Sequence, residues 1–331
     1  LDDLALAMES VVTKMTISKY ENCQIWPSSS VLISLSKALD QPVDYFFRPF
    51  SFEIKAIKFR KTKSRLSTKQ EKAIKESISD LVERYQNVEE ICNDTVLFSC
   101  FVSNPVKDVA DARNAALEVR NRWGIGEDGI VNVINLLEEN GVKILEIDAP
   151  DSFDGLCSIV NEIYPVIVLN KAFPSERKRF TAMHELGHLL LSFSSSITAA
   201  EEEKLCNCFA SEMLIPESSF KREFGNTRRT VSYQELRSMQ IRYGISCDAL
   251  MYKAKECGVI SPRVYSSFCI RKNQHPEFKQ MVERSFYPEE ESLRFVRLVY
   301  KALSNEFISI SKAASLLHQS VEQVRSESGL I

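Results

Sequence analysis

The chain has 331 residues, of which 26% are charged and 44% hydrophobic, a composition typical of a soluble globular protein and not of a disordered chain. This length predicts about two domains, or three. The 42 basic and 45 acidic side chains give a net charge of −3, which argues against a protein that coats nucleic acid with its whole surface but does not exclude a local basic patch.

The sequence contains no sign of a membrane span or of an export signal. No stretch approaches the 18 consecutive apolar residues of a membrane-spanning helix, and the first ten residues show neither a basic n-region nor an apolar h-region. The nine cysteines include no CxxC pair, and their odd number favours reduced thiols. We therefore expect a cytoplasmic protein with no membrane partner.

Residues 1–50 predict a compact module of short helices. Apolar residues recur there at helical spacing in three runs, each beside a serine or threonine that can cap a helix. The first run includes Leu4 and Met8, the second opens at Thr13, and the third opens at Ser29 or Ser30.

Residues 51–103 are expected to form a basic arm followed by a long linker helix. Over residues 51–72, eight basic side chains face two acidic ones, and the apolar residues among them indicate a strand or an extended arm. The helix is expected to begin at Ser67 and to bury an apolar stripe that includes Tyr85. The arm is either a solvated linker face or a segment that contacts phosphates.

The next part of the chain predicts two helices, three strands and a third helix. The first helix follows Asn104-Pro105 and stops at Gly124, where glycine is a common end signal. The strands are runs rich in Val, Ile and Leu. The later elements are expected at 126–141 (helix), 142–147, 155–160 and 164–169 (strands) and 175–193 (helix).

The last of these helices contains the motif that indicates chemistry, His184-Glu185-Leu186-Gly187-His188, an HExxH pattern. Residues four apart lie on one face of a helix, so both histidines can bind one ion while Glu185 reaches a water molecule beside it. The alternative is a pair of satisfied core histidines. The apolar flanks disfavour it, because burying these polar groups is costly unless a metal or hydrogen-bond partners satisfy them.

A zinc site of this kind needs a third protein ligand and an open fourth position. The following predicted helix, which begins near Glu201, places Glu203 and Asn207 on one stripe. We expect Glu203 to face the metal and Asn207 to support a ligand from outside. Cys206 is the weaker alternative ligand, and Glu202 is interpreted together with Glu201 as a solvated first turn.

Four segments carry a resemblance to a known family. RFTAMHELGHLLL and EKLCNCFASEMLIP, preceded by FDGLCSIV and VIVLN, resemble the ImmA/IrrE family of bacterial and phage-borne zinc metallopeptidases, from about Asn104 to the end of the chain. The resemblance implies peptide-bond hydrolysis with a helix-turn-helix repressor as the protein substrate. It also implies zinc as the cofactor, His184, His188 and Glu203 as its ligands, and Glu185 as the catalytic residue.

Residues 1–50 resemble a helix-turn-helix of the XRE type that lacks its leading helix. By this resemblance the recognition helix starts at Thr13. The side chains that would reach base edges or phosphates are Lys14, Met15, Thr16 and Lys19. The module carries four basic and six acidic side chains, and Val11 and Cys23 stand where glycines are common, so DNA binding and a docking role both stay open.

Together these elements predict an α+β, mostly helical protein. We expect a helix-turn-helix at 1–50, the basic arm and linker helix at 51–103, a zincin-like metallopeptidase core at 104–245 and a helical C-terminal domain at 246–331. The core would contain a small three-stranded sheet and the HExxH helix. The C-terminal domain would consist of short helices begun by serine.

The predicted domains and the HExxH motif are compatible with two functions. The first is a zinc-dependent endopeptidase coupled to transcriptional regulation. The alternative is a DNA-binding regulator or antitoxin-like protein whose metal site is structural or latent. A homodimer stays open, and the sequence does not select an oxyanion-stabilising residue among Arg228, Arg229, Tyr233 and Tyr243.

Overall fold

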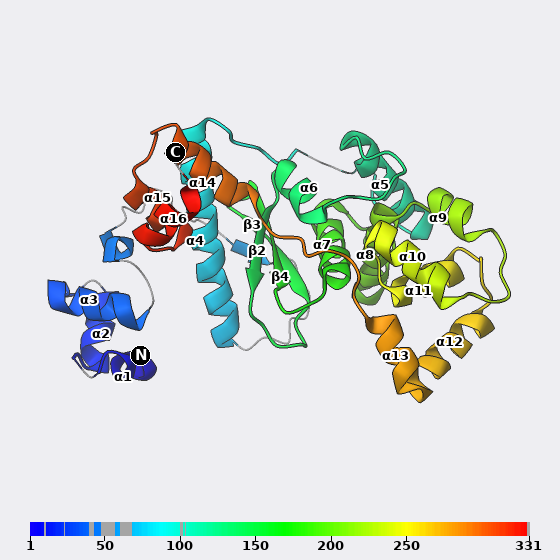
Figure 1. Ribbon diagram of the computed structural model, residues 1–331, viewed down its shortest axis with the longest axis horizontal. Coiled ribbons are helices and arrows are strands. Elements are labelled where there is room, and N and C mark those ends of the chain that lie inside the picture. The colour runs from blue at the N-terminus through cyan, green and yellow to red at the C-terminus, as the bar shows by residue number, and fades with distance from the viewer. Residues whose placement is uncertain are drawn as a thin grey trace. The chain divides into compact units, whose positions relative to one another are not determined.

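The computed structural model describes residues 1–9, 11–22, 24–39, 43–47, 57–59, 68–99, 102 and 104–329 (Figure 1). Contacts divide the chain into two compact units. The first comprises residues 1–53, 83–95 and 295–331, and the second comprises residues 54–82 and 96–294. This division cuts across the predicted segment 246–331, and the predicted domain boundaries stay a prediction.

The first unit begins with three short helices and a 3₁₀ turn: α1 (Asp2–Ala7), α2 (Lys14–Glu21), α3 (Ser29–Ala38) and η1 (Val43–Phe47). The Thr13 side chain caps α2, as predicted, because it accepts a hydrogen bond from the backbone N–H of Thr16. The cap of α3 is Ser28, one residue before the predicted opening. Buried Met8, Ile17, Val31 and Leu35 form the core of these helices.

The same unit contains the end of α4 (Thr68–Cys92) together with α14 (Arg294–Ser304), α15 (Ile310–Leu317) and α16 (Val321–Ser328). Tyr85 of α4 is fully buried, and its ring centroid lies 5.1 Å from that of Phe295. Ser309 and Ser320 cap α15 and α16, which confirms the predicted serine-initiated helices of the tail.

The second unit is built on a mixed four-stranded sheet in the order β1-β3-β4-β2. Three strands lie where they were predicted: β2 (Lys143–Ile147), β3 (Gly155–Val160) and β4 (Tyr164–Asn170). β4 pairs with β3 antiparallel and with β2 parallel, and its buried apolar residues place it inside the sheet.

The fourth strand, β1 (Ile57–Phe59), extends the predicted three-stranded sheet by pairing antiparallel with β3. It comes from the predicted basic arm, so the expectation of a strand there is confirmed at these three residues. The remaining arm residues at 51–56 and 60–67, including the predicted helix start at Ser67, lie outside the described residues.

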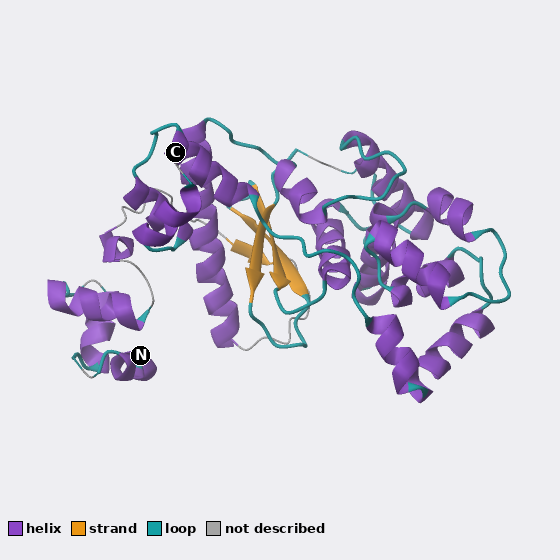
Figure 2. Ribbon diagram, viewed as in Figure 1, coloured by secondary structure: helices purple, strands orange, loops and turns teal. Residues whose placement is uncertain are grey.

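Helices make up most of the second unit, and its strands form one small sheet (Figure 2). α7 packs against β3, β4 and α8, and α8 packs against α5. The helices are α5 (Val109–Arg122), α6 (Val133–Glu139), α7 (Ser175–Leu190), α8 (Ala199–Leu214), α9 (Glu217–Phe224), α10 (Tyr233–Tyr243), α11 (Cys247–Glu256), α12 (Pro262–Gln274) and α13 (Pro276–Glu283). Across the described ranges, no helix is both long enough and apolar enough to cross a membrane.

Two predicted helices are too long. The helix expected at 126–141 begins only at Val133, because Asn132 is extended and caps it, and the carbonyls of Gly126 and Ile130 accept hydrogen bonds from buried arginines instead. The helix expected at 175–193 ends at Leu190. Beyond it, the carbonyl of Ser192 accepts a hydrogen bond from the backbone N–H of Val106, which commits the chain to a β-bridge.

Candidate metal centre

The HExxH residues lie in the buried C-terminal half of α7, which packs against the sheet and α8. The two imidazoles meet edge to face, and the Nε2 atoms of His184 and His188 are 3.1 Å apart. The His188 side chain is 3% exposed, whereas that of His184 is 12% exposed. The pair is therefore accessible from the His184 side.

Glu203 is brought to the histidines by the close approach of α8 to α7. Thr198 and Glu201 form a capping box at the start of α8, within two helical turns of Glu203. Gly187 lies between the histidines, and a side chain there would meet Phe209 at 3.2 Å and Cys206 at 3.5 Å. The missing side chain thus allows α8 to lie against this turn of α7.

The resulting cluster has the dimensions of a zinc site. Glu203 places Oε2 3.2 Å from His184 Nε2 and Oε1 3.4 Å from His188 Nε2. Ligand atoms held about 2.0–2.2 Å from one zinc ion in tetrahedral geometry lie roughly 3.3–3.6 Å apart. Two neutral imidazoles and a carboxylate are also a common donor set for this metal. The residues present therefore fit a zinc ion.

Asn207 orients one of the two histidines. Its Oδ1 lies 3.0 Å from Nδ1 of His184. Because an amide oxygen can only accept, His184 carries a proton on Nδ1, and its Nε2 is directed toward the cluster. An amide one helical turn beyond Glu203 thus fixes the tautomer that a metal ligand needs.

Glu185 is buried beside the cluster with only 2% of its surface exposed. Within the described part of the chain, its Oε2 has no hydrogen-bond partner. Burial raises the pKa of its carboxyl, although the neighbouring histidines and the Cys157 thiol act in the opposite direction. Buried polar atoms usually have a hydrogen-bond partner. We therefore expect a further polar group to lie beside this oxygen, next to the cluster of His184, His188 and Glu203.

The electrostatics of the cluster hold Glu203 ionised. Hydrogen bonds from His184 and then His188 lower the pKa of Glu203 below its usual range. Burial alone would lower the pKa of His188, but the hydrogen bond to Glu203 and the charges of Glu185, Glu203 and Glu202 outweigh it, so this pKa is raised. The site is therefore an acidic pocket that favours a cation.

Three further residues lie near the cluster: Glu202 was misread in the sequence, Cys157 was missed, and Cys206 was considered there as the weaker ligand. Glu202, expected in a solvated turn, places Oε1 3.5 Å from His188 Nδ1. Cys206 is fully buried with its Sγ 3.5 Å from the same Nδ1, on the side of the ring away from Nε2. Cys157 of β3 hydrogen-bonds Glu185, a contact across elements that carries no local sequence signal.

The four candidates for oxyanion stabilisation are all within the described residues, and three have partners elsewhere. Tyr243 donates its hydroxyl hydrogen bond to Glu223, Tyr233 donates to the carbonyl of Met281, and Arg228 pairs with Glu235. These bonds give no reason to select any of the three, and this role stays unassigned.

The predicted DNA-contacting residues lie on α2 in the first unit. Lys14, Met15 and Lys19 are exposed, and 75% of the surface of Met15 is accessible. Thr16 is half-buried, and its hydroxyl bonds that of Thr13. Lys14 forms an ion pair of 2.5 Å with Asp2, an exposed contact that weakens its positive field.

The second unit has the features of a metallopeptidase-like domain: a small mixed sheet, a helix with two histidines one turn apart, and a carboxylate from the next helix. The chain also carries a helix-turn-helix. Comparison with protein families agrees. Residues 137–255 match the IrrE N-terminal-like domain of peptidase family M78, and residues 2–46 match the helix-turn-helix family. No curated protein matches the chain. The chain therefore contains an IrrE-like peptidase domain and a helix-turn-helix domain, which confirms the predicted resemblance to an ImmA/IrrE peptidase fused to a helix-turn-helix.

Proposed function

We propose that the chain is a zinc-dependent endopeptidase coupled to transcriptional regulation, which cleaves a helix-turn-helix repressor protein. The observation that carries the proposal is the convergence of His184, His188 and Glu203 beside an unpartnered oxygen of Glu185. The repressor as substrate is supported by the family resemblance and by the helix-turn-helix domain of the chain itself.

The residues of the site have separate tasks in this mechanism. The two Nε2 atoms and the Glu203 carboxylate would hold zinc, which when bound lowers the pKa of a water molecule and polarises a carbonyl. Glu185 accepts a proton from the attacking water and later donates it to the nitrogen of the leaving amine. Burial suits Glu185 to this exchange, since a raised pKa brings the carboxyl closer to neutral pH.

Metal content tests the proposal directly. The purified full chain is expected to contain about one zinc ion, as a site with three protein ligands should, and His184→Ala is expected to lose most of it. His275→Ala is the matched control, because His275 is an exposed histidine at the start of α13. Elemental analysis of the three proteins measures the difference. Retention of full zinc by His184→Ala would reject this ligand set.

Cleavage then tests the activity. The zinc-loaded chain is incubated with purified small repressors of the helix-turn-helix type, before and after treatment with a chelator. We expect fragments that disappear with the chelator and return with added zinc. Tight zinc binding without cleavage of any repressor would favour a structural or latent metal site instead.

The exposed face of α2 favours a second function, DNA binding. Lys14 and Lys19 are exposed on the predicted recognition helix of a domain that matches the helix-turn-helix family. If each contacts a phosphate, Lys14→Ala and Lys19→Ala should each reduce the slope of log affinity against log salt by about 0.9. Binding to a duplex from the region flanking the gene measures this slope, with exposed Lys37→Ala of α3 as the control. Equal slopes in all four proteins would contradict phosphate contacts by α2.

A further inference from the structure

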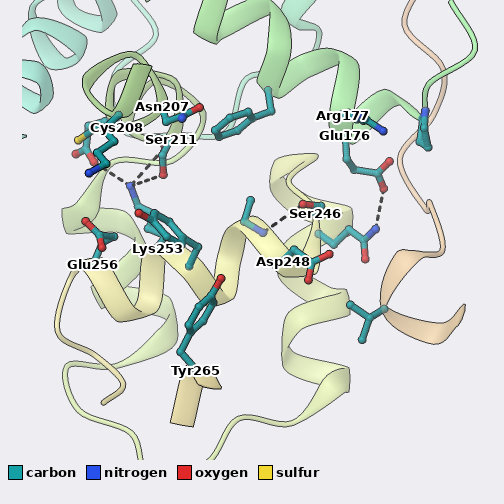
Figure 3. A pocket seen from close by; sticks show the side chains of 18 of the residues that line it. Glu176, Arg177, Asn207, Cys208, Ser211, Ser246, Asp248, Lys253, Glu256 and Tyr265 are labelled. Carbon is teal, nitrogen blue, oxygen red and sulfur yellow. Dashed lines mark hydrogen bonds and ion pairs between the residues drawn. The ribbon is translucent and has the colours of Figure 1, made fainter. Parts of the chain in front are cut away.

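The second unit contains a cavity of about 750 Å³ between α7, α8, α11 and α12. Figure 3 shows Asn207 and Ser211 of α8 on one side, Tyr265 of α12 on another, and Lys253 of α11 reaching toward Ser211. This volume lies in the range of pockets that enclose most of a bound ligand and exceeds what one side chain fills.

The cavity begins beside the candidate metal centre, and Asn207 links the two. Asn207 both contacts His184 and lines the cavity. Phe180, which also lines it, precedes His184 by four residues and therefore lies on the same face of α7, one turn away. One helical turn is about 5.4 Å, which is less than the length of two residues of an extended peptide. If the scissile bond of a peptide substrate is held at the cluster, the side chain of a neighbouring substrate residue therefore reaches the cavity.

Most of the charged side chains around the cavity have partners within the chain, and Lys204 is an exposed lining cation. Lys253 and Glu212 form a buried pair at 2.9 Å, with side chains 5% and 3% exposed. Glu176 accepts hydrogen bonds from Gln240 and Ser285. Further internal pairs include Arg113 with Glu217, Arg177 with Asp154, and Lys272 with both Asp248 and Glu283. A charged side chain that entered would lose hydration and compete with these pairs for partners.

The surfaces left for contact are aromatic and aliphatic. Phe180 and Tyr265 are half-buried, Tyr252 is 45% exposed, and the two tyrosine rings meet edge to face at 6.0 Å. Ala249 lies one turn before Tyr252 and Lys253 on α11, so its small side chain leaves the cavity open there. Exposed rings around a concave space favour bulky uncharged groups, with which they stack or pack.

From this placement, and resting on the proposed function, we propose that the cavity is the specificity pocket of the enzyme. It accepts bulky apolar or aromatic side chains of the polypeptide substrate that lie next to the scissile bond. Asn207 joins the two parts of the site, since it orients His184 on one side and borders the pocket on the other.

Peptide binding to an inactive background tests the pocket without requiring cleavage. Zinc-loaded full chain with Glu185→Gln is mixed with two sets of blocked octapeptides, which differ only in two adjacent central residues, Phe-Leu or Asp-Lys. Affinity selection with mass spectrometry is expected to enrich the Phe-Leu peptides by about tenfold or more. Adding Ala249→Trp, which places a bulky ring inside the pocket, should strongly reduce the enrichment, and Tyr252→Ala at an exposed wall position should also reduce it.

A matched control and a cleavage profile separate the possible failures. Ile270→Trp adds the same ring at an exposed position of α12 outside the cavity and should leave the enrichment unchanged. Enrichment that persists in Ala249→Trp, or a small molecule that occupies the cavity while peptides bind equally well, overturns the pocket proposal. Selective binding without any cleavage by the zinc-loaded wild-type chain overturns the proposed function and leaves the cavity as a peptide-binding site.

Discussion

Replacing Glu185 by glutamine is expected to lower the rate of repressor cleavage by about 10²–10⁴-fold, the contribution that a positioned general acid–base group makes. The amide has nearly the same shape and can fill the same buried position, so His184, His188 and Glu203 should keep their geometry. The glutamine amide, however, cannot accept the proton of the attacking water at neutral pH. Zinc content and melting temperature should therefore stay close to those of the wild type while cleavage is lost.

A matched control and equal zinc loading make this result specific. Glu139→Gln, at an exposed position on α6, makes the same chemical change away from the cluster and should leave the cleavage rate unaltered. The proteins are compared by initial rates at equal zinc occupancy. If Glu185→Gln cleaved the repressor at the wild-type rate, then Glu185 would not be the proton acceptor, and the mechanism proposed for this site would be wrong.

The parts of the fold that the sequence predicted are those with local causes. β4 was recognised because its residues from Val166 to Leu169 are uniformly apolar and fully buried. The N-termini of α2, α15 and α16 could be predicted because serine and threonine are common helix caps. Thr13, Ser309 and Ser320 accept hydrogen bonds from nearby backbone N–H groups. The grouping of His184 with His188 follows from helical spacing alone.

The parts that the sequence did not predict depend on contacts between distant segments. The cavity beside Asn207 exists only because α11 and α12 pack opposite α7 and α8. β1 joins the sheet through pairing with β3, about a hundred residues later. Glu202 was assigned to solvent because an acidic first turn is usually solvated, and its proximity to His188 depends on the packing of α8 against α7.

A buried arginine, Arg179, also depends on contacts between distant segments, and its substitution is expected to cause a large loss of stability. Arg179 is fully buried and pairs with Glu290, which follows α13. Its other nitrogens donate to the carbonyls of Ile130, Tyr243 and Gly244. Glu290 in turn accepts hydrogen bonds from the backbone N–H groups of Val133 and Ile134 at the start of α6. The pair therefore ties α7 to three segments.

Arg179→Met is expected to destabilise the chain by about 3–5 kcal/mol, because it leaves the Glu290 carboxylate buried without its cation. Arg122→Met removes an exposed i,i+4 pair with Glu118 and should cost about 1 kcal/mol or less. Chemical denaturation followed by circular dichroism compares the two variants. Adding Glu290→Leu to Arg179→Met should recover part of the loss, since no uncompensated charge is then buried. Equal destabilisation by Arg179→Met and Arg122→Met would show that the buried pair contributes no more than a surface one.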